Sequence, residues 1–271
     1  MEIINGKVYR DFRNNIIFDK DNPVLAMKAN RDRYIKTNNQ EIYSGLPQIG
    51  SLNSEDALTW NIFREIIPRN GLISFEKLLD IKISNPKLLL WTLSFSKESN
   101  DLQYIVGDYI RNIDGKFKGQ ITEPDIIIDT DDYFIIIECK LGVKNAYPKH
   151  LWESDSENSP EKRYDDYFSK HYFKMDNDTK QIYKTKCYQL FRMVFYTIEI
   201  AEYLHKKPVF VSLTNKTWLN IMRNGIESPI DIFNKFCNTI IKDINVKNIT
   251  WQDLVFDDEI LKNCINNNRC F

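Results

Sequence analysis

The sequence predicts an α/β protein with a central mixed β-sheet flanked by helices. Two isoleucine-rich runs, at 126–128 and 134–137, are separated by five residues of which three are aspartates, a pattern typical of a β-hairpin. A segment with helical spacing precedes the hairpin at 54–66. Another, at 179–205, follows it and leads into an apolar run that begins at Pro208. Helices on both sides of such a hairpin in the chain indicate a layered fold.

The composition is that of a globular protein, because 42% of the 271 residues are hydrophobic and 13% are aromatic. The 37 basic and 38 acidic side chains nearly balance, so any nucleic-acid binding must come from a local patch. No apolar run approaches the roughly 20 residues of a membrane helix, and the amino-terminal segment has no apolar signal core. We therefore expect a cytoplasmic protein with no membrane partner. The five cysteines form no CxxC pair, which predicts reduced thiols.

The elements before the hairpin are predicted from their caps and periods. Residues 1–50 show no lasting period and are expected to form an arm or a small subdomain. Several N-cap residues precede the helix at 54–66, and Pro68 and Gly71 follow it. The other elements expected before the hairpin are one short helix and two strands, at 74–80, 87–95 and 102–114.

The segment after the hairpin, 143–178, is expected to be an insertion without regular structure. It interleaves basic and aromatic side chains, which suit phosphates and unpaired bases, but it holds nearly as many acids. A substrate flap and a solvated insertion therefore both remain open. The next helix and the strand from Pro208 complete a core domain, placed at 51–215. Residues 216–271, with a helical region near 229–242, are expected to form a C-terminal helical extension.

Charged residues stand at the ends of the two isoleucine runs. In a strand, successive side chains alternate between faces, so Glu138 and Lys140 point the same way. A hairpin that turns about Asp131 sets Asp125 beside 136–138 of the second strand. Two carboxylates and an ammonium would then converge where charge is costly to bury unless it is paired. A divalent cation would pair them.

These residues, Pro124-Asp125 followed by Glu138-Cys139-Lys140, resemble the PD-(D/E)xK signature of the restriction-endonuclease-like nuclease superfamily. The resemblance implies a restriction-endonuclease-like core in which Asp125, Glu138 and the carbonyl of Cys139 bind Mg²⁺, with Mn²⁺ as a substitute. It implies that Lys140 is catalytic, orienting a water or stabilising developing negative charge. Two more tripeptides match the pattern without ending an isoleucine-rich strand, at 80–82 and 178–180.

By element order the resemblance covers about 54–215, and it implies two further site residues on helices. Glu55 is centred on the apolar stripe of the first helix, where the family often carries a metal-site glutamate. Alternatively, Glu55 only favours the positive end of its helix. Gln189 lies near the middle of 179–205, where related nucleases often carry a glutamine that reaches the site. Alternatively, it belongs to the solvated face of an ordinary amphipathic helix.

The function that the resemblance implies is that of a metal-dependent endonuclease in restriction, repair or anti-phage defence. Its partner would be nucleic acid, with DNA favoured over RNA, and cutting of both strands would favour a homodimer because one site cuts one strand. Two alternatives stay open. One is a catalytically silent nuclease-fold module that binds nucleic acid or a partner protein. The other is an unrelated interaction domain whose hairpin charges are structural.

Overall fold

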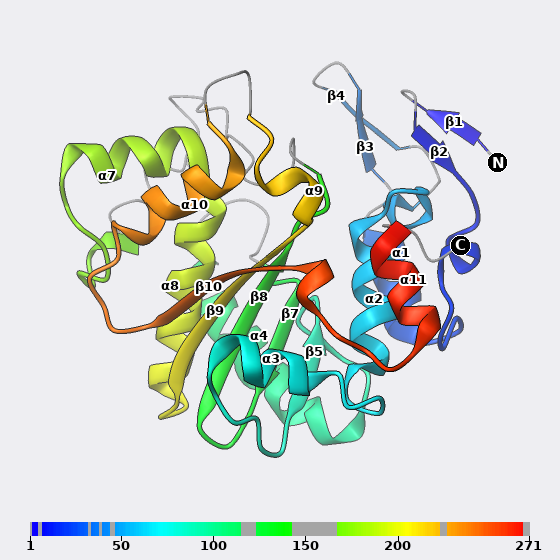
Figure 1. Ribbon diagram of the computed structural model, residues 1–271, viewed down its shortest axis with the longest axis horizontal. Coiled ribbons are helices and arrows are strands. Elements are labelled where there is room, and N and C mark those ends of the chain that lie inside the picture. The colour runs from blue at the N-terminus through cyan, green and yellow to red at the C-terminus, as the bar shows by residue number, and fades with distance from the viewer. Residues whose placement is uncertain are drawn as a thin grey trace. The chain divides into compact units, whose positions relative to one another are not determined.

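The computed structural model describes residues 2–4, 7–31, 34–37, 40–43, 47–114, 123–142, 167–222 and 227–267 (Figure 1). The chain divides into two compact units that are discontinuous in sequence. The first comprises Met1–Lys82, Leu93–Lys97 and Gln252–Phe271. The second comprises Ile83–Thr92 and Glu98–Trp251. Neither boundary coincides with the expected ones at 50 and 215.

The second unit is built on a mixed sheet, as predicted. The described residues of this unit contribute five strands, in the order β10-β9-β8-β7-β5. Their bounds are β5 Lys87–Leu90, β7 Ile126–Asp129, β8 Tyr133–Cys139, β9 Lys207–Thr214 and β10 Asn245–Thr250. The short strand β6, Leu93–Ser94, belongs to the first unit. Strands β8, β9 and β10 are parallel, whereas β7 runs antiparallel to both β8 and β5. The carboxyl ends of β8 and β9 therefore lie at the same edge of the sheet as the amino end of β7.

The predicted hairpin is confirmed as β7 and β8. Ile126 pairs with Ile137 and Asp129 with Phe134, so extending the register by one residue sets Asp125 opposite Glu138. The backbone N–H of Thr130 donates to the carbonyl of Tyr133 across the turn. All apolar residues of the two strands except Tyr133 are buried, which explains why the strands read as continuous isoleucine runs without polar alternation.

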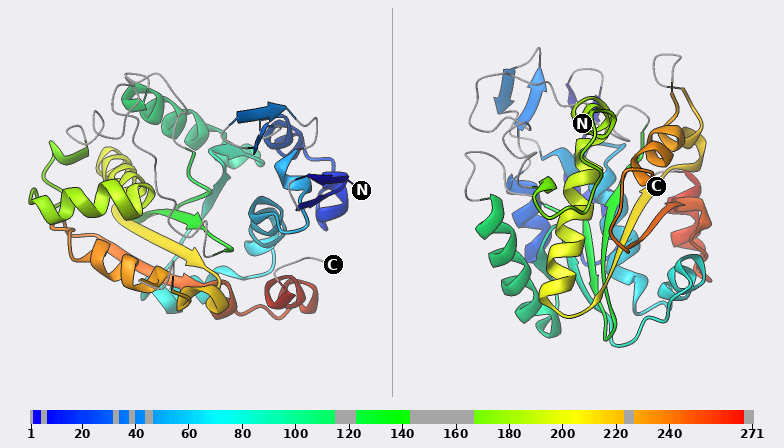
Figure 2. Two further views of the ribbon diagram at one scale, coloured as in Figure 1. Left: turned by 90° about the horizontal axis from the view of Figure 1, so that it is seen from above. Right: turned by 90° about the vertical axis from the view of Figure 1, so that its left-hand side faces the viewer.

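Helices α4 and α8 pack beside each other on one face of this sheet (Figure 2). Strand β9 follows α8 directly, in a parallel crossover from β8 through α8 to β9. The core of the unit joins α4 and α8 to the sheet through side chains such as Val106, Phe134, Val194 and Phe210. The helical segments are α4 Asn100–Asp114, α7 Asn177–Ile182, the π-helical turn η4 Tyr183–Cys187, α8 Tyr188–Tyr203, α9 Lys216–Leu219 and α10 Pro229–Cys237.

The prediction of a strand at 102–114 is wrong, because this segment is the helix α4. Its buried apolar residues, Leu102, Val106 and Ile110, recur every fourth position, whereas Tyr104 and Ile105 are exposed. A helix with one buried stripe gives this pattern. Several apolar residues outside the stripe hide that period in the sequence.

Two further expectations are corrected in part. The strand expected at 87–95 is interrupted by Trp91 and Thr92, whose φ angles of 52° and 64° are left-handed and cannot continue a strand. The expected helical extension contains α10 but also β10, which pairs with β9. The hydrogen bonds that β10 makes with β9 explain why the carboxyl-terminal region contributes to the sheet unit up to Trp251.

The first unit contains most of the expected amino-terminal arm and both early helices. Ser54 caps α2 by accepting a hydrogen bond from the backbone N–H of Ala57, as its sequence predicts. Leu58, Ile62 and Phe63 of α2 are buried. The elements are β1 Glu2–Ile4, β2 Lys7–Tyr9, η1 Phe12–Asn15, α1 Pro23–Arg31, β3 Tyr34–Thr37, β4 Gln40–Tyr43, η2 Gln48–Gly50, α2 Glu55–Ile66, α3 Leu72–Leu79 and α11 Glu259–Asn267. Among the described residues of both units, the search for a helix long and apolar enough to span a bilayer finds none.

Candidate functional site

The candidate site lies at the edge of the sheet where β8 and β9 end and β7 begins. Asp125 directly precedes β7, and Lys140 directly follows β8. The backbone N–H of Lys140 donates to the carbonyl of Leu213 at 2.8 Å, which extends the pairing of β8 with β9. The backbone N–H of Cys139 donates to Oδ2 of Asp125 at 2.7 Å. Both flanks of the site are thus fixed by backbone hydrogen bonds.

The three charged side chains converge, as strand alternation predicts. The Nζ atom of Lys140 lies 2.7 Å from Oε1 of Glu138, 2.8 Å from the carbonyl oxygen of Cys139 and 3.9 Å from Oδ2 of Asp125. The ammonium is therefore surrounded by the three oxygen groups that the sequence predicts as metal ligands. The cation that these oxygen groups surround in the structure is thus the ammonium of Lys140 itself.

The site is buried, and two carboxylates lie within 3.9 Å of the one ammonium. The side chains of Glu138, Lys140 and Asp125 are only 4%, 8% and 16% exposed. Two carboxylates share one ammonium, and Oε2 of Glu138 has no hydrogen-bond partner among the residues that the structure describes. A buried carboxylate oxygen without a partner is costly and uncommon in native proteins. The arrangement therefore has capacity for a further positive charge.

The donor chemistry of the site fits a hard divalent cation. Two carboxylates and the peptide carbonyl of Cys139 are oxygen donors of the kind that Mg²⁺ and Mn²⁺ prefer. In the described part of the chain, no three or more histidine, cysteine, aspartate or glutamate residues gather as a metal-binding cluster. Magnesium sites commonly keep several waters and use one or two carboxylates, so a set of two carboxylates is compatible with this ion.

Gln189 lies in the first turn of α8, not in the middle of one long helix. The predicted helix at 179–205 is divided by the π-helical turn, and α8 begins again at Tyr188. Because β9 starts just after α8 ends, and α8 is about 24 Å long at 1.5 Å per residue, the first turn of α8 lies toward the carboxyl ends of β8 and β9. Oε1 of Gln189 is buried without a hydrogen-bond partner among the described residues. The structure thus places Gln189 toward the sheet edge of the site, with no hydrogen bond to the other site residues.

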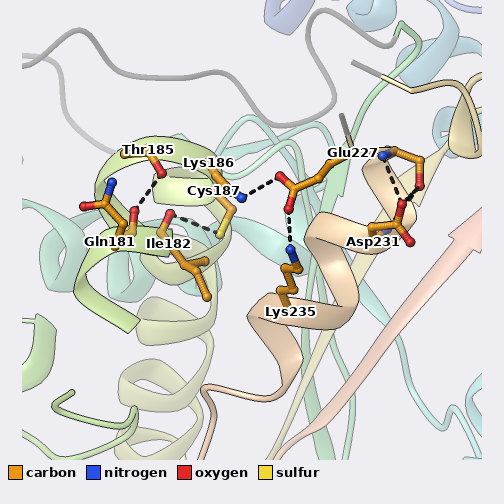
Figure 3. Close-up of polar contacts among 9 residues, drawn as sticks. Gln181, Ile182, Thr185, Lys186, Cys187, Glu227, Asp231 and Lys235 are labelled. Atoms are coloured by element: carbon orange, nitrogen blue, oxygen red, sulfur yellow. Dashed lines mark hydrogen bonds and ion pairs between the residues drawn. The ribbon is translucent and has the colours of Figure 1, made fainter. Parts of the chain in front are cut away.

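An ion-pair network ties the π-helical turn to α10 (Figure 3). The carboxylate of Glu227 accepts from Nζ of Lys186 at 2.5 Å and also from Nζ of Lys235. These hydrogen bonds, with that of Lys186 the stronger, hold the pKa of the Glu227 carboxyl below its usual range. The turn immediately precedes α8, so the network connects the start of the helix that carries Gln189 to α10. Such π-turns occur often at functional sites.

Glu55 belongs to the first unit, whereas the other predicted site residues belong to the second. It is the first residue of α2, next to the Ser54 cap, and is partly buried. Its position in the first turn fits the alternative that it favours the positive helix end. A role for Glu55 in the site stays a prediction from the sequence.

The predicted insertion at 143–178 is described only from residue 167 onward, so most of its basic and aromatic residues lie outside the described part. Within that part, Tyr167 and Tyr172 are buried in the core of the second unit. The hydroxyl of Tyr172 donates to Glu199 at 2.6 Å, and burial with this contact raises its pKa above the ordinary value. These two aromatic rings support the fold and are not available to stack on bases.

Two features that the sequence analysis did not identify adjoin the site. The backbone N–H of Trp91 donates to the carbonyl of Asp125 at 3.0 Å from within the left-handed turn at Trp91 and Thr92. Trp218, in α9, lines a small pocket together with Lys140. The helix-capping sequence that begins with Asn215, directly after an apolar strand, signals the start of α9, but no pattern in the sequence reveals that β8 ends beside it.

Comparisons with protein-family models, with curated proteins and with solved structures give no match. The site itself holds a buried triad of Asp125, Glu138 and Lys140, in which one carboxylate oxygen has no hydrogen-bond partner among the described residues.

Proposed function

We propose that the protein is a metal-dependent nuclease of the PD-(D/E)xK, restriction-endonuclease-like kind, which hydrolyses phosphodiester bonds. One observation carries the proposal: two buried carboxylates and a peptide carbonyl surround the ammonium of Lys140, and Oε2 of Glu138 has no hydrogen-bond partner in the part of the chain that the structure describes. The order Asp125, Glu138, Cys139, Lys140 along a hairpin of the sheet agrees with this kind of site. DNA is the favoured substrate and defence or repair the favoured setting, on the resemblance alone.

In this proposal Asp125, Glu138 and the carbonyl of Cys139 hold Mg²⁺. When bound, the ion lowers the pKa of a coordinated water and neutralises charge on the phosphate. Asp125 is held by the N–H of Cys139, so one of its oxygens is oriented before any ligand arrives. Preorganised ligands of this kind lose little conformational freedom on binding.

Lys140 has the catalytic role. Its backbone is fixed by the carbonyl of Leu213, so its ammonium stays within reach of the three oxygen groups. There it orients the attacking water or stabilises the negative charge that develops on the phosphate oxygens, because a fixed cation acts strongly in a site of low dielectric constant.

The test is incubation of the purified protein with linear, circular and single-stranded DNA and with RNA, with Mg²⁺, with Mn²⁺ and with chelator. We expect cleavage of at least one DNA substrate with either ion and none with chelator. Full cleavage in chelator would exclude the metal mechanism. Cutting of both strands at one place would favour a homodimer.

Isothermal titration with Mn²⁺ separates the two alternatives. A protein that binds Mn²⁺ and nucleic acid but cleaves nothing would be a silent nuclease-fold module. A protein that binds no Mn²⁺ would have a structural ion pair at the hairpin and would contradict the proposal. Asp125→Asn is expected to weaken Mn²⁺ binding, whereas Asp129→Asn, in the same strand, is the control and should not.

A further inference from the structure

A small pocket adjoins Lys140 at the carboxyl ends of β8 and β9. Its lining includes Lys140, Gly142, Asn215, Trp218 and Pro229. Its free volume of about 10 Å³ suffices for one water molecule at most and cannot hold a base. The pocket therefore shows that residues Trp218 and Lys140 line one small space.

Strand β9 fixes both residues. Its Leu213 carbonyl accepts from the backbone of Lys140, and α9 begins two residues later. The side chain of Asn215 accepts from the N–H of Thr217 at 2.8 Å, and its carbonyl accepts from the N–H of Trp218 at 3.0 Å. Asn215 is 1% exposed, so this start of α9 is well ordered by packing and hydrogen bonds. The backbones of Lys140 and of α9 are thus both held at the carboxyl end of β9.

Trp218 differs from the other tryptophans that the structure describes. Those three, Trp60, Trp91 and Trp251, are fully buried, whereas Trp218 is 40% exposed. Ile221 and Met222, just beyond α9, are also exposed, by 42% and 56%. Exposed apolar side chains gathered beside polar groups often mark a binding surface. Here the pocket beside Trp218 is also lined by Lys140 of the proposed catalytic site.

We infer that the exposed face of Trp218 stacks on an unpaired base of the nucleic acid, next to the phosphate that Lys140 contacts. The inference rests on the proposed function and specifies its substrate. An aromatic face beside a cation matches a base beside its phosphate. A base within a duplex is already stacked on both sides, so the substrate must be single-stranded or locally unpaired at this position.

Binding to the Asp125→Asn protein tests the inference without cleavage. Fluorescence anisotropy would measure dissociation constants for a single-stranded oligonucleotide, for the same strand with abasic sites and for a blunt duplex. We expect Trp218→Ala in this background to weaken binding of the single strand by about 10-fold, the scale of losing one stacked base. Trp218→Phe, which retains a ring, should recover most of that loss. Binding of the abasic strand and of the duplex should change less than twofold.

The matched control is Tyr203→Ala, because Tyr203 is an exposed aromatic residue at the opposite end of α8. It should leave all three dissociation constants unchanged. A Trp218→Ala protein that melts like its parent and binds the single strand equally well would overturn the inference while the nuclease proposal stands. Equal weakening for the duplex and the abasic strand would overturn it too. If the Asp125→Asn protein binds no nucleic acid at all, the proposed function itself fails.

Discussion

Both ends of the β7–β8 hairpin place buried carboxylates beside a lysine ammonium, one carboxylate at the turn end and two at the open end. At the turn end, the carboxylate of Asp129 pairs with the ammonium of Lys206, and the two side chains are 9% and 18% exposed. At the open end, the carboxylates of Asp125 and Glu138 share the ammonium of Lys140 at similar burial. At the turn end one carboxylate pairs with one ammonium. At the open end two carboxylates lie near one ammonium, and Oε2 of Glu138 has no hydrogen-bond partner among the described residues.

The ion pair at the turn end has an evident structural role. The backbone N–H of Lys206 donates to Ala201, and that of Lys207 donates to Asp132, so this pair joins the end of α8 and the start of β9 to the hairpin turn. At the open end, Asp125 accepts the backbone N–H of Cys139, whereas Oε2 of Glu138 has no hydrogen-bond partner among the described residues. Local arrangements that break the rule of paired buried charge are expected where function requires them. The difference between the ends thus distinguishes a structural ion pair from a proposed cation site.

The largest expected effect is on stability. Lys140→Met leaves two buried carboxylates unneutralised and should lower the free energy of unfolding by on the order of 3 kcal/mol in chelator. Mn²⁺ at 100 times its dissociation constant should restore about 2.7 kcal/mol, because the ion replaces the ammonium among the same oxygens. Urea unfolding with and without Mn²⁺ measures both values.

Lys206→Met is the matched control for that measurement. It leaves Asp129 unpaired and should cost a similar free energy, but Mn²⁺ should restore none of it because a single carboxylate holds the ion poorly. If Mn²⁺ raises the free energy of unfolding of both variants equally, the proposal that only the open end of the hairpin binds a cation is contradicted.

The next effect is on turnover. In saturating Mn²⁺, where Lys140→Met is folded, single-turnover cleavage should be about 100-fold slower than in the parent, the scale of losing one electrostatic catalyst. Lys206→Met should cleave within twofold of the parent. If Lys140→Met cleaves as fast as the parent, the only role of Lys140 is to neutralise the carboxylates of Asp125 and Glu138.

Glu55 tests whether a third carboxylate serves the reaction. Glu55→Ala should slow cleavage by about 10-fold, the scale of removing a supporting group at a metal site, without unfolding the protein. The control is the neighbouring Asp56→Ala, which removes an ion pair of 3.7 Å with Lys28 and should leave the cleavage rate unchanged. Equal rates for Glu55→Ala and the parent would leave Glu55 with its effect on the helix end alone.

The smallest effect is expected at Gln189. Gln189→Leu removes an amide oxygen that has no hydrogen-bond partner among the described residues, so stability should not fall. Cleavage should slow by about threefold, the scale of one hydrogen bond made in the reaction. Gln181→Leu, at an exposed position before the π-turn, is the control and should cleave at the parental rate. A clear loss of stability for Gln189→Leu would point to a structural contact instead.

Local rules were sufficient for much of the fold and for the centre of the site. The isoleucine runs and the aspartate turn predicted the hairpin, and the period of two predicted that Glu138 and Lys140 share a face. Ser54 predicted where α2 begins. These features depend on interactions between near neighbours in the chain, so their signals are written in short stretches of sequence.

The rest was decided by tertiary structure. The apolar run at 102–114 is a helix because only its Leu102, Val106 and Ile110 stripe packs into the core, and the run itself does not reveal that choice. Strand β10 forms because it pairs with β9. Gln189 lies in the first turn of α8 because a π-turn, which forms an ion pair with Glu227, interrupts the helix before it. Trp218 meets Lys140 because β9 supports both residues, 78 positions apart. Such contacts join segments that are remote in sequence. Which of these contacts form depends on which surfaces are buried together in the folded chain, and no single segment of the sequence determines this.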